Sequence, residues 1–243
     1  MKTNVHWFTY LLAIVCIVSV AGFSMAFADA HEMAEESHAE HEEEAAEEKS
    51  SIPGWFRVDT DSLGTNFLIG ATHVVGGIPL ASTIYIGGTS GEYDLGVVLP
   101  VVKGESTSLT LLPTLGVGFD YSGANGPSTL FPQMFVFLPA GKFYFQSWTI
   151  ATLFLPSYSE DATNTVYTRN RLTYRINDTV DLGPQAEAVY LFDGIGIVSF
   201  IIGGRINIAY GENNTLGVLV GYDLEKGEDD TGITGRLSFT RNW

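Results

Sequence analysis

The sequence has almost no cysteine and few basic residues. Cys16 is the single cysteine among 243 residues, so the chain beyond it has no disulfide, no catalytic thiol and no cysteine metal site. Lys and Arg number 12 against 28 Asp and Glu, which gives a net charge of −16. Proteins that bind nucleic acid are usually basic, so we expect no nucleic-acid partner.

The amino terminus has the three parts of a secretory signal peptide. Lys2 precedes the apolar run Leu11–Phe23, and small residues follow, ending in Ala28-Asp29-Ala30. This order predicts that residues 1–30 are a signal peptide cleaved after Ala30, with a cut after Ala28 as the alternative. An uncleaved membrane anchor fits less well, because a spanning helix needs ~20 apolar residues.

Residues 31–51 are acidic and rich in Glu, Ala and His. Residues 31–50 hold nine Glu and one Lys, whereas residues 51–243 hold 18 acidic and 10 basic residues. A segment with so few large apolar side chains cannot fold alone, so we predict a flexible periplasmic leader. His31, His38 and His41 are weak candidate ligands for a transition metal, but closing a site on such a chain costs conformational entropy.

The chain from residue 52 to residue 243 shows the period of β-strands. Residues 62–91 carry no Asp, Glu, Lys or Arg, but their seven glycines and Pro79 argue against a helix. Apolar and polar residues alternate most clearly near the carboxyl terminus, as expected for strands with one apolar face. The predicted strands lie near residues 54–60, 64–75, 78–87, 91–102, 108–120, 129–138, 143–156, 165–177, 179–192, 197–210, 214–225 and 231–243.

These strands predict an all-β transmembrane antiparallel up-and-down β-barrel of about 12 strands, with ten as the alternative. Tight turns alternate with longer connections along the chain, which is typical of outer-membrane barrels. A soluble β-sandwich or a lipocalin-like barrel has the same period. The membrane barrel is favoured because the polar face is rich in Gly, Thr, Ser and Asn, and because aromatic residues recur at strand ends.

The last predicted strand carries a resemblance. Phe239 and Trp243 lie on its apolar face, and the chain ends on Trp243. This strand resembles the carboxyl-terminal strand of bacterial outer-membrane β-barrel proteins, although Arg241 departs from the pattern. The resemblance implies an outer-membrane location, contact with outer-membrane lipid and lipopolysaccharide, and recognition of Phe239 and Trp243 by the barrel-assembly machinery.

The sequence predicts no catalytic residue. His73 is the single histidine after the leader, and no serine stands at a spacing that indicates an acyl-transfer site. A hydrolase acting on outer-membrane lipid is therefore an alternative function only. No glycine-rich phosphate loop opens a helix, and we expect no cofactor.

The interior of the predicted barrel is the main candidate site. Its arginines and acids could form a transverse field across a narrow porin-like channel for small polar or anionic solutes, or they could pair and fill a closed structural barrel. The arginine content is similar to that of small twelve-stranded channels for acidic oligosaccharides; a surface-binding barrel is a further alternative. The expected inward charges are Arg169, Arg171, Arg175, Arg205, Arg236, Asp94, Asp120, Asp181, Glu187 and Asp223.

Overall fold

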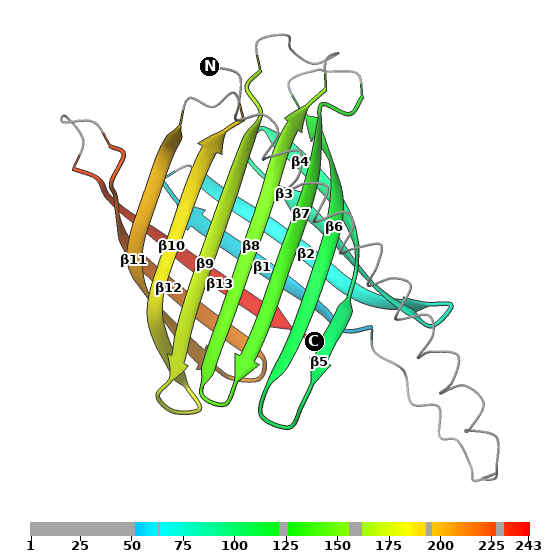
Figure 1. Cartoon of the computed structure of the whole chain (residues 1–243), viewed down its shortest axis with the longest axis vertical. Helices are drawn as coiled ribbons and strands as arrows, with labels where there is room; N and C mark the ends of the chain where they lie inside the picture. The colour runs from blue at the N-terminus through cyan, green and yellow to red at the C-terminus, as the bar shows by residue number, and fades with distance from the viewer. Residues whose placement is uncertain (1–51, 63, 122–125, 156–161, 193–195, 227–230) are drawn as a thin grey trace, which may run out of the picture. The chain divides into compact units, whose positions relative to one another are not determined.

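The computed structural model describes residues 52–62, 64–121, 126–155, 162–192, 196–226 and 231–243 (Figure 1). The predicted signal peptide, the acidic leader and its three histidines lie outside these residues. No helix within the described ranges is long and apolar enough to cross a membrane.

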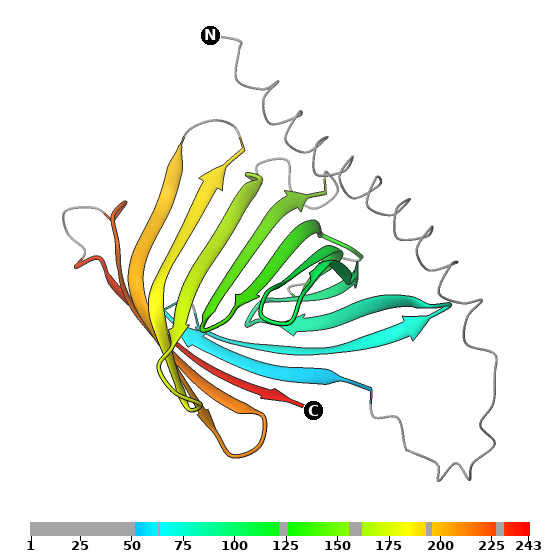
Figure 2. The same cartoon turned by 60° about the horizontal axis from the view of Figure 1, so that its bottom comes forward.

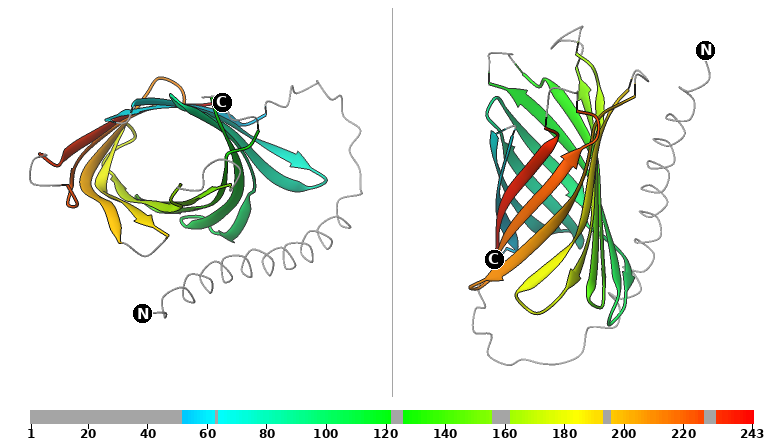
Figure 3. Two further views of the ribbon diagram at one scale, coloured as in Figure 1. Left: turned by 90° about the horizontal axis from the view of Figure 1, so that it is seen from above. Right: turned by 90° about the vertical axis from the view of Figure 1, so that its left-hand side faces the viewer.

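The described chain forms one antiparallel sheet that closes on itself. Strands that follow one another in sequence are paired except for β4 and β5, because β4 pairs with β6 instead, and β1 pairs with β13 to close the ring (Figure 3). The strands are β1 (Gly54–Asp61), β2 (Gly64–Val75), β3 (Ile78–Ile86), β4 (Ser90–Val97), β5 (Leu99–Lys103), β6 (Ser108–Asp120), β7 (Thr129–Ala140), β8 (Phe143–Phe154), β9 (Thr165–Arg175), β10 (Val180–Leu191), β11 (Ile197–Tyr210), β12 (Asn214–Asp223) and β13 (Ile233–Asn242).

The predicted strand at residues 91–102 is divided into β4 and β5. β4 pairs with both β3 and β6, whereas β5 pairs with β6 alone. The division follows from the length of β3, which begins at Ile78. The hydrogen bond from the Val98 amide to the Pro79 carbonyl, 2.9 Å long, is the last one between this segment and β3, so residues beyond Val98 have no partner on that side within the described ranges. β4 and β5 occupy one position in the ring, so the 13 strands make a twelve-position barrel as predicted.

The two rims of the barrel differ in their connections. The turn rim carries the tight turns that follow β2, β7, β9 and β11 and the loop that joins β5 to β6 (Figure 2). Gly76 and Gly77 have φ of 59° and 81°, a left-handed conformation that glycine adopts without steric cost. The loop rim carries the longer connections after β6, β8 and β12, but short ones after β1 and β3. The predicted alternation of tight turns at one rim with longer connections at the other therefore holds for much of the ring.

The apolar face of the strands points outward. Val220, Leu237 and Leu182 on this face are 62%, 50% and 44% exposed, as expected for side chains that contact lipid. Aromatic residues lie near both rims on the same face, including Tyr190 and Tyr222 at the loop rim and Phe143, Tyr174 and Tyr210 at the turn rim. A soluble sandwich or lipocalin-like barrel would bury its apolar face, so these alternatives do not fit.

The closing seam joins β1 to β13 through Trp243 and Phe239. Gly54 and Trp243 exchange two backbone hydrogen bonds of 3.0 Å. A Cβ atom on Gly54 would lie 2.7 Å from the Trp243 ring, so the indole packs where only glycine leaves room. The ring of Phe239 packs against that of Phe56 across the seam, with 6.5 Å between the ring centroids. The two residues expected to guide assembly therefore both lie at the point of closure.

Candidate functional site

One cavity of about 1090 Å³ runs along the inside of the barrel. Thr89 and Asp120 line it near the loop rim, and Thr110, Tyr144 and Thr215 line it near the turn rim. Residues from every strand except β5 contribute to its wall. The inward face of the barrel thus encloses a narrow bore rather than a solid core.

Four arginines form a cationic cluster in this bore. Arg57 lies on β1, Arg169 and Arg171 on β9, and Arg205 on β11, and all four line the cavity. Their positive charges act on one another across the bore. The strands that carry them come from distant parts of the chain, so the cluster exists only because the sheet closes.

The cationic cluster has more positive charge than its ion pairs neutralise. Arg57 pairs with Asp59, with 2.7 Å between Nη2 and Oδ2. Arg205 donates from Nε to the amide oxygen of Asn207 at 2.7 Å, which leaves its charge uncompensated. Within the described ranges, no carboxylate lies at ion-pair distance from Arg169, Arg171 or Arg205. These three guanidinium groups can therefore attract an anion that enters the bore.

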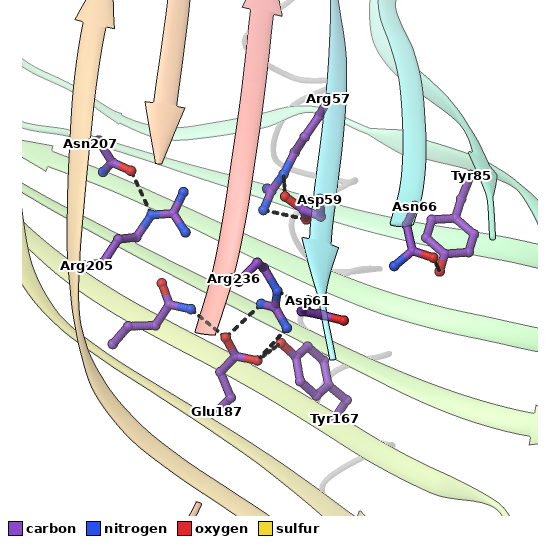
Figure 4. A network of polar contacts seen from close by, with 11 residues as sticks. Arg57, Asp59, Asp61, Asn66, Tyr85, Tyr167, Glu187, Arg205, Asn207 and Arg236 are labelled. Atoms are coloured by element: carbon purple, nitrogen blue, oxygen red, sulfur yellow. Dashed lines mark hydrogen bonds and ion pairs between the residues drawn. The ribbon is translucent and has the colours of Figure 1, made fainter. Parts of the chain in front are cut away.

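A second polar group crosses the bore between β13 and β10 (Figure 4). Arg236 donates to both carboxylate oxygens of Glu187, at 2.8 and 3.2 Å, and to Asp61 at 3.0 Å. Tyr167 and Gln185 also donate to Glu187, each at 2.5 Å. We call Asp61, Arg236, Glu187 and Tyr167 the ion-pair bridge. It fills part of the bore near β10 and narrows the passage.

Acidic side chains gather on the wall opposite Arg205. Glu92 and Asp94 lie on β4, which is six strands from β11 in either direction round the ring. The Gln133 amide nitrogen donates to both carboxylates, at 2.6 and 2.7 Å. Two carboxyl groups this close do not both ionise readily, and the negative charge that the pair keeps, facing the positive charge of the cationic cluster, produces a field across the bore.

Aromatic rings cover the wall on β7 and β8. The rings of Phe137 and Phe135 are parallel, with 1° between their planes and 6.1 Å between their centroids. Phe135 also stacks on Trp148, with 6° between planes and 5.5 Å between centroids. All three line the cavity, and we call them the aromatic column. The Arg169 guanidinium lies 4.9 Å from the Trp148 ring, and that of Arg171 lies 5.4 Å from the Tyr144 ring. The aromatic wall therefore adjoins the cationic cluster directly.

The structure places most of the expected inward charges in the bore. Glu187 lies in the ion-pair bridge. Arg175 ends β9 at the turn rim and does not line the cavity, and Asp223 ends β12, where it accepts from Ser199 and from the Phe200 backbone. The expected residues that do line the cavity are Arg169, Arg171, Arg205, Arg236, Asp94, Asp120 and Asp181.

Sequence reasoning missed two parts of the site. Arg57, Asp59 and Asp61 share one parity on β1, and this alternation of charged residues is visible in the sequence itself. The aromatic column gave no such signal, because β7 and β8 are apolar on both faces.

His73 lies outside the bore. Its Nε2 is 3.3 Å from the Ser82 hydroxyl, and the neighbours Thr72, Ala81 and Thr83 line the cavity from the opposite face. The described residues contain no group of three or more His, Cys, Asp or Glu side chains suited to a metal.

Comparison with known proteins identifies the fold. No protein-family model matches the sequence, and no curated protein matches it either. Among solved structures, KdgM porin is similar over 79% of this chain and 99% of its own, with 10% identity and a TM-score of 0.50. A structure of KdgM porin with disordered oligogalacturonate has a TM-score of 0.49 at 10% identity, covering 79% of this chain and 99% of that one. NanC porin has a TM-score of 0.48 at 11% identity, covering 77% and 97%. The likeness to the first of these structures, together with the closed antiparallel sheet, shows that the chain has the porin β-barrel fold.

Proposed function

We propose that this barrel is a narrow channel of the bacterial outer membrane that passes small polar or anionic solutes. The observation that carries the proposal is a cavity that reaches from rim to rim and is lined by Arg169, Arg171 and Arg205, which have no carboxylate partner in the described structure. Positive charge lining a narrow pore favours anions.

The same proposal includes the cellular setting. Residues 1–30 direct export and are removed, and the acidic leader 31–51 stays in the periplasm. The outward apolar face contacts outer-membrane lipid and lipopolysaccharide, and the assembly machinery recognises the strand that ends with Phe239 and Trp243. The membrane barrel fold and the aromatic residues near both rims support this setting.

A closed structural barrel is the second candidate. The ion-pair bridge favours it, because Arg236 spans from Glu187 to Asp61 and occupies space in the bore. A lipid hydrolase has less support, since His73 contacts Ser82 on the outer face without a third group among the described residues to orient the imidazole. A surface-binding barrel rests on no described contact.

Single-channel recording in a planar bilayer tests the proposal. The refolded wild-type protein should give small currents and a reversal potential that shows anion preference in a salt gradient. Changing Arg169→Gln and Arg171→Gln together should shift the reversal potential toward cations, because it removes two charges from the wall. Arg175→Gln removes one positive charge from a residue on the same strand that does not line the cavity, and it should leave selectivity unchanged.

Two results would contradict the proposal. Absence of channels over many insertions would mean that the bore is sealed by the ion-pair bridge. Unchanged selectivity in a conducting double variant would mean that ions do not pass Arg169 and Arg171.

A further inference from the structure

The aromatic column is unusual for the inside of a membrane barrel. The interior of such barrels is generally polar, and apolar residues face lipid. Here Phe135, Phe137 and Trp148 face the bore, and Leu112 and Ile150 line the cavity beside them. Apolar side chains that line a water-filled passage provide a surface on which the apolar part of a solute can be removed from water.

The column ends at groups that bind anions. Arg169 lies over the ring of Trp148, and Arg171 lies over the ring of Tyr144. Neither forms an ion pair with a carboxylate within the described ranges. A guanidinium held over an aromatic ring keeps its N–H donors available for a carboxylate. One small molecule can therefore contact the rings and a guanidinium together.

The aromatic wall offers few partners for hydroxyl groups. Gln133 of β7 and Gln146 of β8 are the amide side chains beside the column. The Gln146 oxygen is buried, so a solute in the bore does not reach it, and the Gln133 side chain is already occupied. Its amide nitrogen donates to Glu92 and Asp94, and its oxygen accepts from the Trp148 indole at 2.8 Å. A solute rich in hydroxyls loses hydrogen bonds to water at such a wall, whereas a flat carbon ring loses none.

The acids on β4 determine on which side of the bore the carboxylate of a solute lies. Glu92 and Asp94 approach the aromatic wall through Gln133, and two carboxyl groups this close to each other do not both ionise readily. The negative charge that the pair keeps repels an anionic group from that side. A carboxylate is therefore held toward β9 and β11, while the ring that carries it lies along β7 and β8.

We infer, on the basis of the proposed channel function, that the solutes of this bore are aromatic carboxylates, with the ring on the aromatic column and the carboxylate on Arg169 and Arg171. Aromatic contacts stabilise a bound ring beyond the area that they bury. Benzoate, which has one ring and one carboxylate, is the simplest probe of this site. Acetate keeps the carboxylate without a ring, and galacturonate keeps a ring but covers it with hydroxyls.

The experiment compares these three anions on the refolded full-length mature protein. Reversal potentials with chloride on one side of a bilayer and each anion on the other give relative permeability, and calorimetric titration in detergent gives binding without conduction. Benzoate should bind about five- to tenfold more tightly than acetate or galacturonate, as expected for added aromatic contacts. Changing Phe135→Leu and Phe137→Leu together should reduce benzoate binding toward the acetate value.

A matched control separates the column from general packing. Phe145→Leu makes the same change on β8 at a residue that does not line the cavity, and benzoate binding should stay at the wild-type value. The heat-dependent shift in gel migration shows whether each variant has folded.

Each remaining result decides one proposal. Anion-selective current with equal binding of benzoate and acetate would overturn the inference and leave the channel intact, and tighter binding of galacturonate would do the same. Benzoate binding without current would support the aromatic site and overturn the channel. Absence of both current and benzoate binding would overturn both.

Discussion

Replacing Arg236 should destabilise the barrel more than replacing any exposed charge. The guanidinium makes three hydrogen bonds, of 2.8, 3.0 and 3.2 Å, to Glu187 and Asp61. The Glu187 side chain is 2% exposed, so Arg236→Gln leaves a buried carboxylate without its cation. Breaking a buried pair in this way costs about 3–5 kcal/mol. Tyr167 and Gln185 still donate to Glu187, which places the expected loss near the lower value, about 3 kcal/mol.

Equilibrium unfolding in urea, with the protein in lipid vesicles, measures this loss. Arg241→Gln is the matched control, because Arg241 is an exposed residue of the same strand and should change the free energy of unfolding by less than about 0.5 kcal/mol. Combining Arg236→Gln with Glu187→Gln should recover part of the loss, since the unpaired charge is then gone. Strictly additive losses, or an Arg236→Gln variant as stable as wild type, would refute a bridge that couples β13 to β10.

Three further predictions concern the seam, the acidic wall and the leader. Gly54→Val should lower the yield of folded barrel, because its Cβ would lie 2.7 Å from the Trp243 ring, whereas Gly88→Ala has no atom within 4 Å and should fold normally on a heat-shift gel. Changing Glu92→Gln and Asp94→Asn together should strengthen anion preference in a salt gradient, since negative charge leaves the bore. The control Glu212→Gln, at the turn rim, should leave anion preference unchanged. A shift of the double variant toward cations would contradict the placement of these acids. Deleting residues 31–50 should leave refolding intact, because the segment has no apolar face to contribute, and failure to refold would mean that the leader is part of the barrel.

The strands were predictable because the lipid requires an apolar residue at every second position. On β12, Leu216, Val218 and Val220 alternate with Thr215 and Gly217, and the structure keeps that register against β11 and β13. The break between β4 and β5 was not predictable in the same way. It depends on where β3 begins, which is a property of the neighbouring strand rather than of residues 91–102.

The orientation of β7 and β8 shows why part of the site lay beyond sequence reasoning. Phe135 and Phe137 share one parity of β7, but Met134 and Val136 make the other parity apolar too, so hydrophobic period alone cannot decide which side meets lipid. The decision comes from pairing. Gln133 stands opposite Thr114 on β6 and Ile150 on β8, and its amide reaches the acids of β4 only if its parity faces inward. One polar residue thus fixes the direction of its strand, because a carboxamide facing lipid would lose its hydrogen bonds. The phenylalanines of the same parity then follow it into the bore, where they border the arginines of β9.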